Sequence, residues 1–290
     1  MSIQLIPYKP AGTIGSGPYV LREYKPDTGV DISSLSITYT GAHTDYGMVT
    51  MSDGARYRLL AFTGSGTLSI EQPVNCEVCV VGGGANGSKA TRYEGGDGGA
   101  GAYLKNQSVS AYNGGSVVVG AGQGVSSIAD VSVNAVSGKS GGTGAGGNTA
   151  GTGDGISKYP FEDTGYSLWT GKPHCGGGGQ GSLEHQTKYD AIIGYNGGNG
   201  GTNGGNGYKQ ANSQVSTPSN SAGGSYGGGA GGSYRSGVIG LMNGGNATYY
   251  GSGAGGGGYY KNIDGALWRY NGGSGYQGIV YMRIPEEQAA

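Results

Sequence analysis

The sequence predicts an all-β plus polyglycine II fold: an antiparallel β-sandwich with an inserted bundle of packed polyglycine II helices and almost no α-helix. Three observations support this. Short segments alternate apolar and polar residues between turn residues, 69 of the 290 residues are glycines gathered in runs, and 23 tyrosines accompany a charged fraction of only 12%. The low charge, the tyrosines and the alternating segments argue against the disorder that so much glycine would otherwise suggest.

The first 34 residues are rich in proline and glycine and are predicted to form an irregular N-terminal attachment arm. Residues 35–284 are predicted to form the β-sandwich, closed by its C-terminal strand, and residues 285–290 a short tail. Strands are expected where β-branched and aromatic residues lie between turn residues, at residues 36–40, 47–51, 56–62, 66–70, 75–81, 102–104, 116–119 and 278–284.

The glycine-rich region runs from about residue 82 to 275 and contains repeated runs without a strict repeat. Collagen is excluded, because four consecutive glycines at 255–258 break its three-residue register. A helix of the polyproline II type has three residues per turn and no internal hydrogen bonds, so its N–H and C=O groups point sideways and need partners. Several such helices side by side can satisfy one another, because glycine lets backbones approach closely.

Interleaved segments must reverse the chain between the glycine runs, at residues 156–175, 182–196, 208–222, 233–243 and 259–271. Most of the large side chains of the region lie in or beside these reversals. Since exposed aromatic side chains in loops are where binding energy concentrates, we expect partner contacts among Phe161, Tyr166, Trp169, Tyr189, Tyr234, Tyr249, Tyr250 and Trp268. Some of them are expected only to cap helix ends.

No cofactor or metal site is predicted. Residues 82–87 satisfy G-x-G-x-x-G after a strand, but no helix pattern follows to face a pyrophosphate. Cys76 and Cys79 are three apart on a strand and should face opposite sides, so they are interpreted as core cysteines. No catalytic set can be assembled from His43, His174, His185 and the scattered acidic residues, so no enzyme is predicted.

Charge and hydropathy limit the partners. The formal net charge is -1 and no basic stripe accompanies the glycine runs, so nucleic-acid binding is not expected. No segment has the length and hydrophobicity needed for membrane insertion, and the first residues lack the pattern of a signal peptide.

Several motifs in order resemble the glycine-rich tail and tail-fibre-tip proteins of bacteriophages: residues 62–70, 78–84, 98–104, 117–122 and 278–283. The likeness covers roughly residues 36–284. In that family, segments between polyglycine II helices contact the host surface. The glycine-rich extracellular domain of anaplastic lymphoma kinase is more distantly similar. Unlike the adhesins, this chain has its β-rich part before the glycine motifs.

The resemblance implies a receptor-binding adhesin, made in the host cytoplasm without a signal peptide and located in the virion at the tail or fibre tip. Its partners would be a bacterial cell-surface protein or glycan and other virion tail proteins, with several copies on one virion. Two alternatives remain at this stage: a structural tail or decoration protein without host contact, and an envelope-degrading enzyme.

Overall fold

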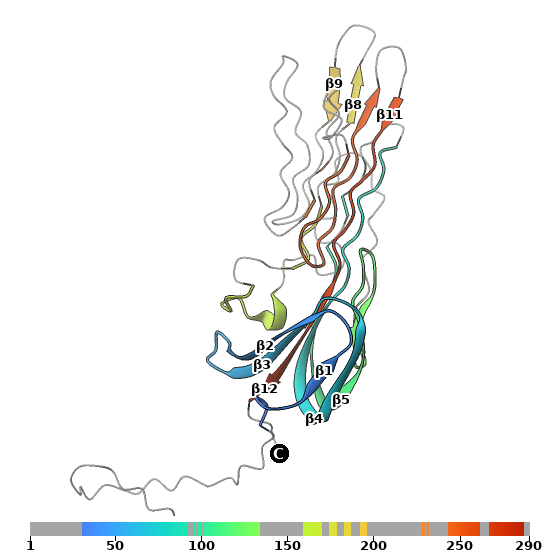
Figure 1. The fold of residues 1–290 in the computed structure, drawn as a ribbon. Helices are drawn as coiled ribbons and strands as arrows, with labels where there is room; N and C mark the ends of the chain where they lie inside the picture. The colour runs from blue at the N-terminus through green and yellow to red at the C-terminus, as the bar shows by residue number, and fades with distance from the viewer. Residues whose placement is uncertain are drawn as a thin grey trace, which may run out of the picture.

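A computed structural model of the chain describes residues 31–91, 96, 98–99, 101–133, 159–169, 174–178, 183–186, 192–195, 228–229, 231, 243–261 and 267–286. Within these residues the protein is mostly β, with an antiparallel sheet and no α-helix, as predicted; the one helical turn is the 3-10 turn η1 (Pro160–Glu162). The larger sheet lies at one end, and extended glycine-rich segments lead from it to a small sheet at the other end (Figure 1).

The larger sheet has eight strands, and every pair in it is antiparallel. The strand order is β2-β3-β12-β4-β5-β6-β7, and β1 pairs separately with β4. The strands are β1 (Ile37–Tyr39), β2 (His43–Thr50), β3 (Arg56–Phe62), β4 (Gly66–Val81), β5 (Leu104–Val118), β6 (Ser126–Ile128), β7 (Val131–Val133) and β12 (Ile279–Pro285). The C-terminal strand was predicted to close the β-rich part, and it lies in the middle of the sheet, between β3 and β4, a place that was not predicted.

Two of the predicted strand pairs are single long strands. Residues 66–81 are all β4 and residues 104–118 are all β5, and their pairing slips between Ser69 and Cys76. Pro73 lies inside this slip, where a strand tolerates proline because no ladder hydrogen bond is lost. Gly114 lies opposite with a φ of 112°, which only glycine adopts readily. The sheet can therefore bend here.

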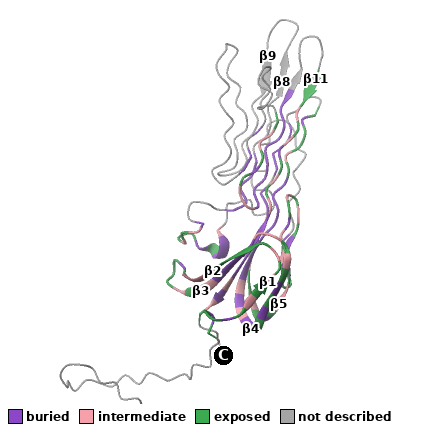
Figure 2. Cartoon of the chain, in the orientation of Figure 1, coloured by how far each residue is buried: buried purple, intermediate pink, exposed green. Residues whose placement is uncertain are grey.

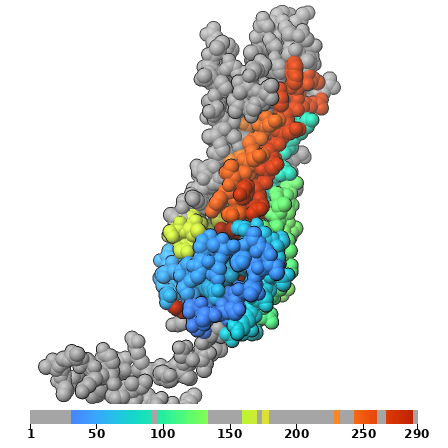
Figure 3. Space-filling view, in the orientation of Figure 1, coloured from blue at the N-terminus to red at the C-terminus, as the bar shows by residue number. Residues whose placement is uncertain are grey.

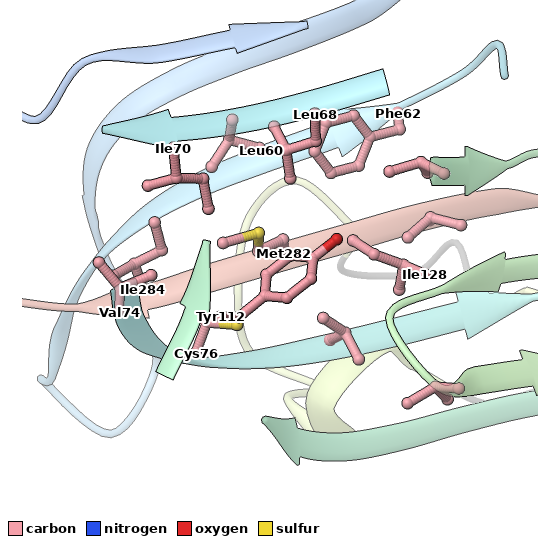
Figure 4. Packing of buried hydrophobic residues seen from close by; sticks show 14 of the residues in the cluster. Leu60, Phe62, Leu68, Ile70, Val74, Cys76, Tyr112, Ile128, Met282 and Ile284 are labelled. Atoms are coloured by element: carbon pink, nitrogen blue, oxygen red, sulfur yellow. The ribbon is translucent and has the colours of Figure 1, made fainter. Parts of the chain in front are cut away.

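Two apolar clusters lie on the two sides of β3, β4 and β12, because successive side chains of a strand point to opposite faces. Val280, Met282 and Ile284 face the first cluster, in which Phe62, Leu68 and Ile128 are also buried (Figure 4). Ile279 and Tyr281 face the second. Burying a large apolar side chain contributes about 1.5–3 kcal/mol, so these strands are stabilised from both faces.

The core begins earlier than predicted. Ile32 is buried in the first cluster, and the Arg58 guanidinium donates to the carbonyl oxygens of Ile32 and Leu35. The predicted boundary of the arm at residue 34 is therefore a few residues late, and residues 1–30 lie outside the described residues. At the other end, β12 extends to Pro285, and the Glu286 N–H donates to the Arg56 carbonyl.

The small sheet has the order β11-β10-β8-β9. Its strands are β8 (Leu183–Gln186), β9 (Ile192–Tyr195), β10 (Tyr259–Lys261) and β11 (Leu267–Arg269). β8 pairs antiparallel with β9 and β10 with β11, while β10 and β8 run parallel. Two of the reversals predicted as loops, at 182–196 and 259–271, therefore contain paired strands.

Glycine-rich segments connect the two sheets and are joined by backbone hydrogen bonds. The central segment is 251–258, in which every residue is buried (Figure 2). It bonds to six other segments: 82–91, the described residues between 96 and 102, 174–178, the described residues between 228 and 231, 243–247 and 270–278. We call these bonded glycine-rich segments the stem. Figure 3 shows two of them, the orange 243–258 and the red 270–278, lying against each other.

The hydrogen bonds between these segments recur at every third residue. Tyr270, Gly273 and Tyr276 donate to the carbonyls of Gly258, Gly255 and Ser252 in turn. Two further ladders keep the same step: residues 96, 99 and 102 donate to 257, 254 and 251, and residues 84, 87 and 90 donate to 276, 273 and 270. In a β-strand, side-chain positions repeat every second residue instead. The bonded segments therefore share a three-residue period.

The segments lie backbone against backbone. A Cβ added to Gly87 would clash with the carbonyl oxygen of Gly255, and one added to Gly99 would clash with that of Ala85. A Cβ on Gly178 would meet the carbonyl oxygen of Ala254. Glycine is thus required at these positions for close approach, and the buried Ala85 and Ala254 occupy places that admit a methyl group.

Candidate contact surfaces

Two of the predicted contact residues are buried beside the larger sheet. Phe161 is 9% exposed and Trp169 is 0% exposed, and both belong to the second apolar cluster. The Trp169 indole N–H donates to the Asp163 carbonyl, and its ring lies 5.5 Å from that of Tyr281. The prediction that these two rings are exposed for partner contact is therefore wrong, because they cover an apolar face of β3, β4 and β12.

The Arg283 guanidinium closes this cluster from β12. It lies 4.4 Å from the centre of the Tyr57 ring and 4.5 Å from that of Phe161, within the range of cation–π attraction. The same guanidinium donates from Nε and Nη2 to Oε2 of Glu77, at 3.2 and 2.8 Å. Its charge is therefore neutralised within the fold and is not offered to a ligand.

Asp163 fixes the segment 159–169 against the larger sheet. Its carboxylate accepts hydrogen bonds from the backbone N–H groups of Ser52, Gly165 and Tyr166, each at 3.0 Å. Burial by itself raises the pKa of Asp163, but these hydrogen bonds favour the charged form and hold the pKa below its ordinary value. The half-buried Tyr166 is thereby held at the edge of the cluster.

His174 lies buried where the glycine segments meet the larger sheet. Its Nε2 is 3.1 Å from the Tyr281 hydroxyl, and its Nδ1 has no hydrogen-bond partner among the described residues. Burial lowers the pKa of His174 to about 3, so the imidazole is neutral at pH 7. Its ring centre lies 5.0 Å from that of Tyr249 and 6.1 Å from that of Tyr250.

Five tyrosines at or near this junction form what we call the tyrosine collar: Tyr46, Tyr166, Tyr249, Tyr250 and Tyr276. Tyr249, Tyr250 and Tyr276 are joined by ring contacts, and Tyr46 lies close enough to Tyr166, Tyr249 and Tyr250 to act on their charge. The exposed fractions of Tyr46 and Tyr276 are 41% and 36%, and the other three are half-buried. The Tyr250 ring lies 5.3 Å from that of Tyr249 and 5.6 Å, edge to face, from that of Tyr276. Burial raises the pKa of Tyr249 to about 12, so its hydroxyl keeps its proton.

The sequence predicted only three of these five tyrosines as contact residues: Tyr166, Tyr249 and Tyr250. Tyr276 lies in a glycine run directly before β12, and Tyr46 lies in β2 at a bulge where Gly47 has a φ of 66°. Nothing in their local pattern separates them from core tyrosines, because the collar forms from segments that are distant in sequence.

A second exposed group lies at the end of the stem far from the larger sheet. All three residues of β11, Leu267, Trp268 and Arg269, are exposed, and the exposed fraction of Trp268 is 41%. β11 is one of the two edge strands of the small sheet (Figure 1). Of the other predicted contacts, Tyr189 and Tyr234 lie outside the described residues.

The glycine motif at residues 82–87 and the cysteine pair Cys76 and Cys79 have structural roles in the fold. The N–H groups of Gly83, Gly84 and Gly87 donate to backbone carbonyls, so they are not free to cradle a phosphate, and no helix begins there. Cys76 and Cys79 are buried in different clusters on opposite faces of β4, as predicted. Within the described residues, no three metal-binding side chains come together, and no helix is long and apolar enough to cross a membrane.

No known protein family matches the chain, and no curated protein sequence is significantly similar to it.

Proposed function

We propose that the protein is a receptor-binding adhesin of a bacteriophage, which attaches the virion to a bacterial surface protein or glycan. The larger sheet forms the base, the glycine segments form a stiff stem, and the far end of the stem carries the contact residues. The ordered motifs that resemble phage tail-fibre-tip proteins supply the class of protein, and the geometry of the stem supports the role.

The stem is best explained as a bundle of polyglycine II helices. A helix with three residues per turn directs an N–H group toward the same neighbour at every third residue, and the ladders at 270, 273 and 276 have this step. Six bonded neighbours around the segment 251–258 are what hexagonal packing of such helices requires. Cα–H···O contacts between the glycine backbones would add to the stability.

The base is best explained as a β-sandwich. β1 pairs with residues 68–70 of β4, whereas β12 pairs with residues 77–81 beyond the slip. A bend in β4 between these two pairings lets the halves of one sheet face each other across the first apolar cluster. Such a base gives the stem a fixed root.

Exposure of Leu267, Trp268 and Arg269 at the far end carries the proposal. Tryptophan and arginine are the residues most enriched where single side chains dominate binding. A stiff stem lowers the entropy lost on binding, and several copies on one virion would convert weak single contacts into strong attachment.

The test is binding of the purified, fluorescently labelled protein to a panel of bacterial strains. Trp268→Ala should reduce binding to a susceptible strain at least tenfold, while Val118→Ser, which changes an exposed apolar residue of β5, should leave it unchanged. Both variants should keep the melting temperature of the parent. Failure to bind any strain, together with incorporation into purified tails, would instead support a structural virion protein. Release of soluble sugar from envelopes would support an enzyme.

A further inference from the structure

We infer that the tyrosine collar is a second binding surface, distinct from the far end of the stem, and that its ligand is a neutral oligosaccharide of the bacterial envelope. The inference rests on the proposed attachment function and adds the chemical class of one ligand.

The collar presents rings and hydroxyls together. The hydroxyls of Tyr249, Tyr250 and Tyr276 make no hydrogen bond with any other described residue, although these rings contact one another. Phenol rings offer an apolar face, and their hydroxyls both donate and accept hydrogen bonds. A sugar ring has the complementary arrangement, with C–H groups on its face and hydroxyls at its edge.

The charges around the collar favour a neutral ligand. The pKa shifts of Tyr166, Tyr249 and Tyr250 come from burial and then from neighbouring phenols, and no lysine or arginine contributes to them. The one carboxylate involved, that of Asp163, is already hydrogen-bonded by three backbone N–H groups. Among the described residues, no cation contributes to these pKa shifts, so an acidic glycan or a phosphate would find no cation of the described residues to pair with here.

The size of the collar favours an oligosaccharide over a protein. A tyrosine side chain can bury on the order of 200 Å²; Tyr46 and Tyr276 are 41% and 36% exposed, and the other three are less exposed. The collar therefore offers less than roughly 400 Å², well below the ~800 Å² per partner of a stable protein interface. That area is enough for a few sugar rings.

A buried histidine supports the collar from below. His174 packs under Tyr249 and Tyr250, and its hydrogen bond to Tyr281 joins it to β12. The rings are thus held in place before a ligand arrives, which lowers the entropy lost on binding.

The experiment uses the full-length protein on an array of neutral hexose and N-acetylhexosamine oligosaccharides beside sialylated and uronate ones. We expect binding to neutral members only, followed by calorimetric titration of the best ligand. Tyr276→Ala and Tyr250→Ala should each weaken the affinity at least tenfold, and Tyr276→Phe two- to fivefold, because it keeps the ring and loses the hydroxyl. Val118→Ser should leave the affinity unchanged.

Three results would overturn the inference: no binding to neutral oligosaccharides, a preference for acidic ones, or affinity in Tyr276→Ala within twofold of the parent. Collar-dependent capture of a glycan-free envelope protein without oligosaccharide binding would overturn it too. If only the collar inference fails, the protein still binds intact cells through Trp268. If the adhesin proposal fails, the protein does not bind cells, whatever the array shows.

Discussion

Substitution of Gly87 by alanine tests the close packing of the stem. At an ordinary glycine position the change would stabilise the protein by about 0.4–1 kcal/mol, because alanine has less freedom in the unfolded chain. At Gly87 the new Cβ would clash with the carbonyl oxygen of Gly255, and a backbone atom cannot move aside as the end of a side chain can. We therefore expect the opposite sign.

The magnitude follows from the hydrogen bonds that would have to shift. Gly87 donates to Gly273 at 3.0 Å, Gly273 to Gly255 at 2.8 Å and Gly255 to Gly245 at 2.8 Å. At about 0.5–1.5 kcal/mol net for each bond, loss of the three bonds costs roughly 1.5–4.5 kcal/mol. After the gain of about 0.4–1 kcal/mol in the unfolded chain, roughly 0.5–4 kcal/mol of destabilisation remains. With an unfolding entropy of about 2.1 cal/mol/K per residue, that lowers the melting temperature of this chain by roughly 1–7 °C.

The assay is thermal and urea unfolding followed by circular dichroism, with hydrogen exchange read on peptides that cover residues 251–258 and 270–278. Gly64→Ala is the comparison: its added Cβ meets Ala42 at 3.2 Å, a tight contact that a shift of a few tenths of an ångström relieves, so the change should destabilise the protein less than Gly87→Ala does. A stabilised or unchanged Gly87→Ala protein would refute the close backbone packing on which the stem depends.

Three further predictions concern the base of the stem. Burial holds the pKa of His174 at about 3, whereas an unfolded histidine titrates near 6.5, so the free energy of unfolding should fall as the pH drops from 6.5 towards 3, by about 2 kcal/mol at pH 5. Urea unfolding at pH 7 and pH 5 measures this fall. In His174→Gln, the difference in unfolding free energy between the two pH values should be smaller. Asp163→Asn places an amide N–H against the backbone N–H of Ser52 and should lower the free energy of unfolding by about 1–2 kcal/mol. Because the Trp169 indole is bonded to residue 163, its near-ultraviolet circular dichroism signal should weaken. An unchanged signal would contradict the role of Asp163. Since the thiols of Cys76 and Cys79 face different clusters, a chelator should leave the melting temperature unchanged, and a fall would reveal a metal that these contacts do not explain.

Local patterns were sufficient for some strands of the larger sheet and not for others. β3 spans 56–62 as predicted, because alternating apolar residues there lie between clear turn residues. β6 and β7 were missed, because each has only three residues and the turn between them contains Ala129 with a φ of 50°. These short strands form because β6 pairs with β5 and β7 pairs with β6, and a local window around β6 and β7 does not contain β5.

The contact residues were harder to predict, because burial depends on distant parts of the chain. Trp169 has the composition of an exposed loop around it, yet Tyr281, more than a hundred residues later, covers its ring. Conversely, Tyr276 is 36% exposed although its backbone N–H is bonded to the buried segment 251–258. Sequence periodicity identifies which face of one element is apolar, but it does not identify the element that covers it.

Asparagines show how the edge of the stem is completed. The Oδ1 atoms of Asn243 and Asn246 accept hydrogen bonds from the N–H groups of Asn271 and Ser274, at 3.0 and 2.9 Å. Both donors and both acceptors are three residues apart, so the side chains follow the period of the backbone ladder. Because Gly244 and Ala247 also donate to Asn271 and Ser274, each contact between these segments uses a backbone bond and a side-chain bond together. Asn246→Ala should therefore lower the free energy of local opening of the segments 243–247 and 270–278 by about 1 kcal/mol, while residues 251–258 stay protected from hydrogen exchange. An equal loss of protection in residues 251–258 would mean that the stem unfolds as one unit.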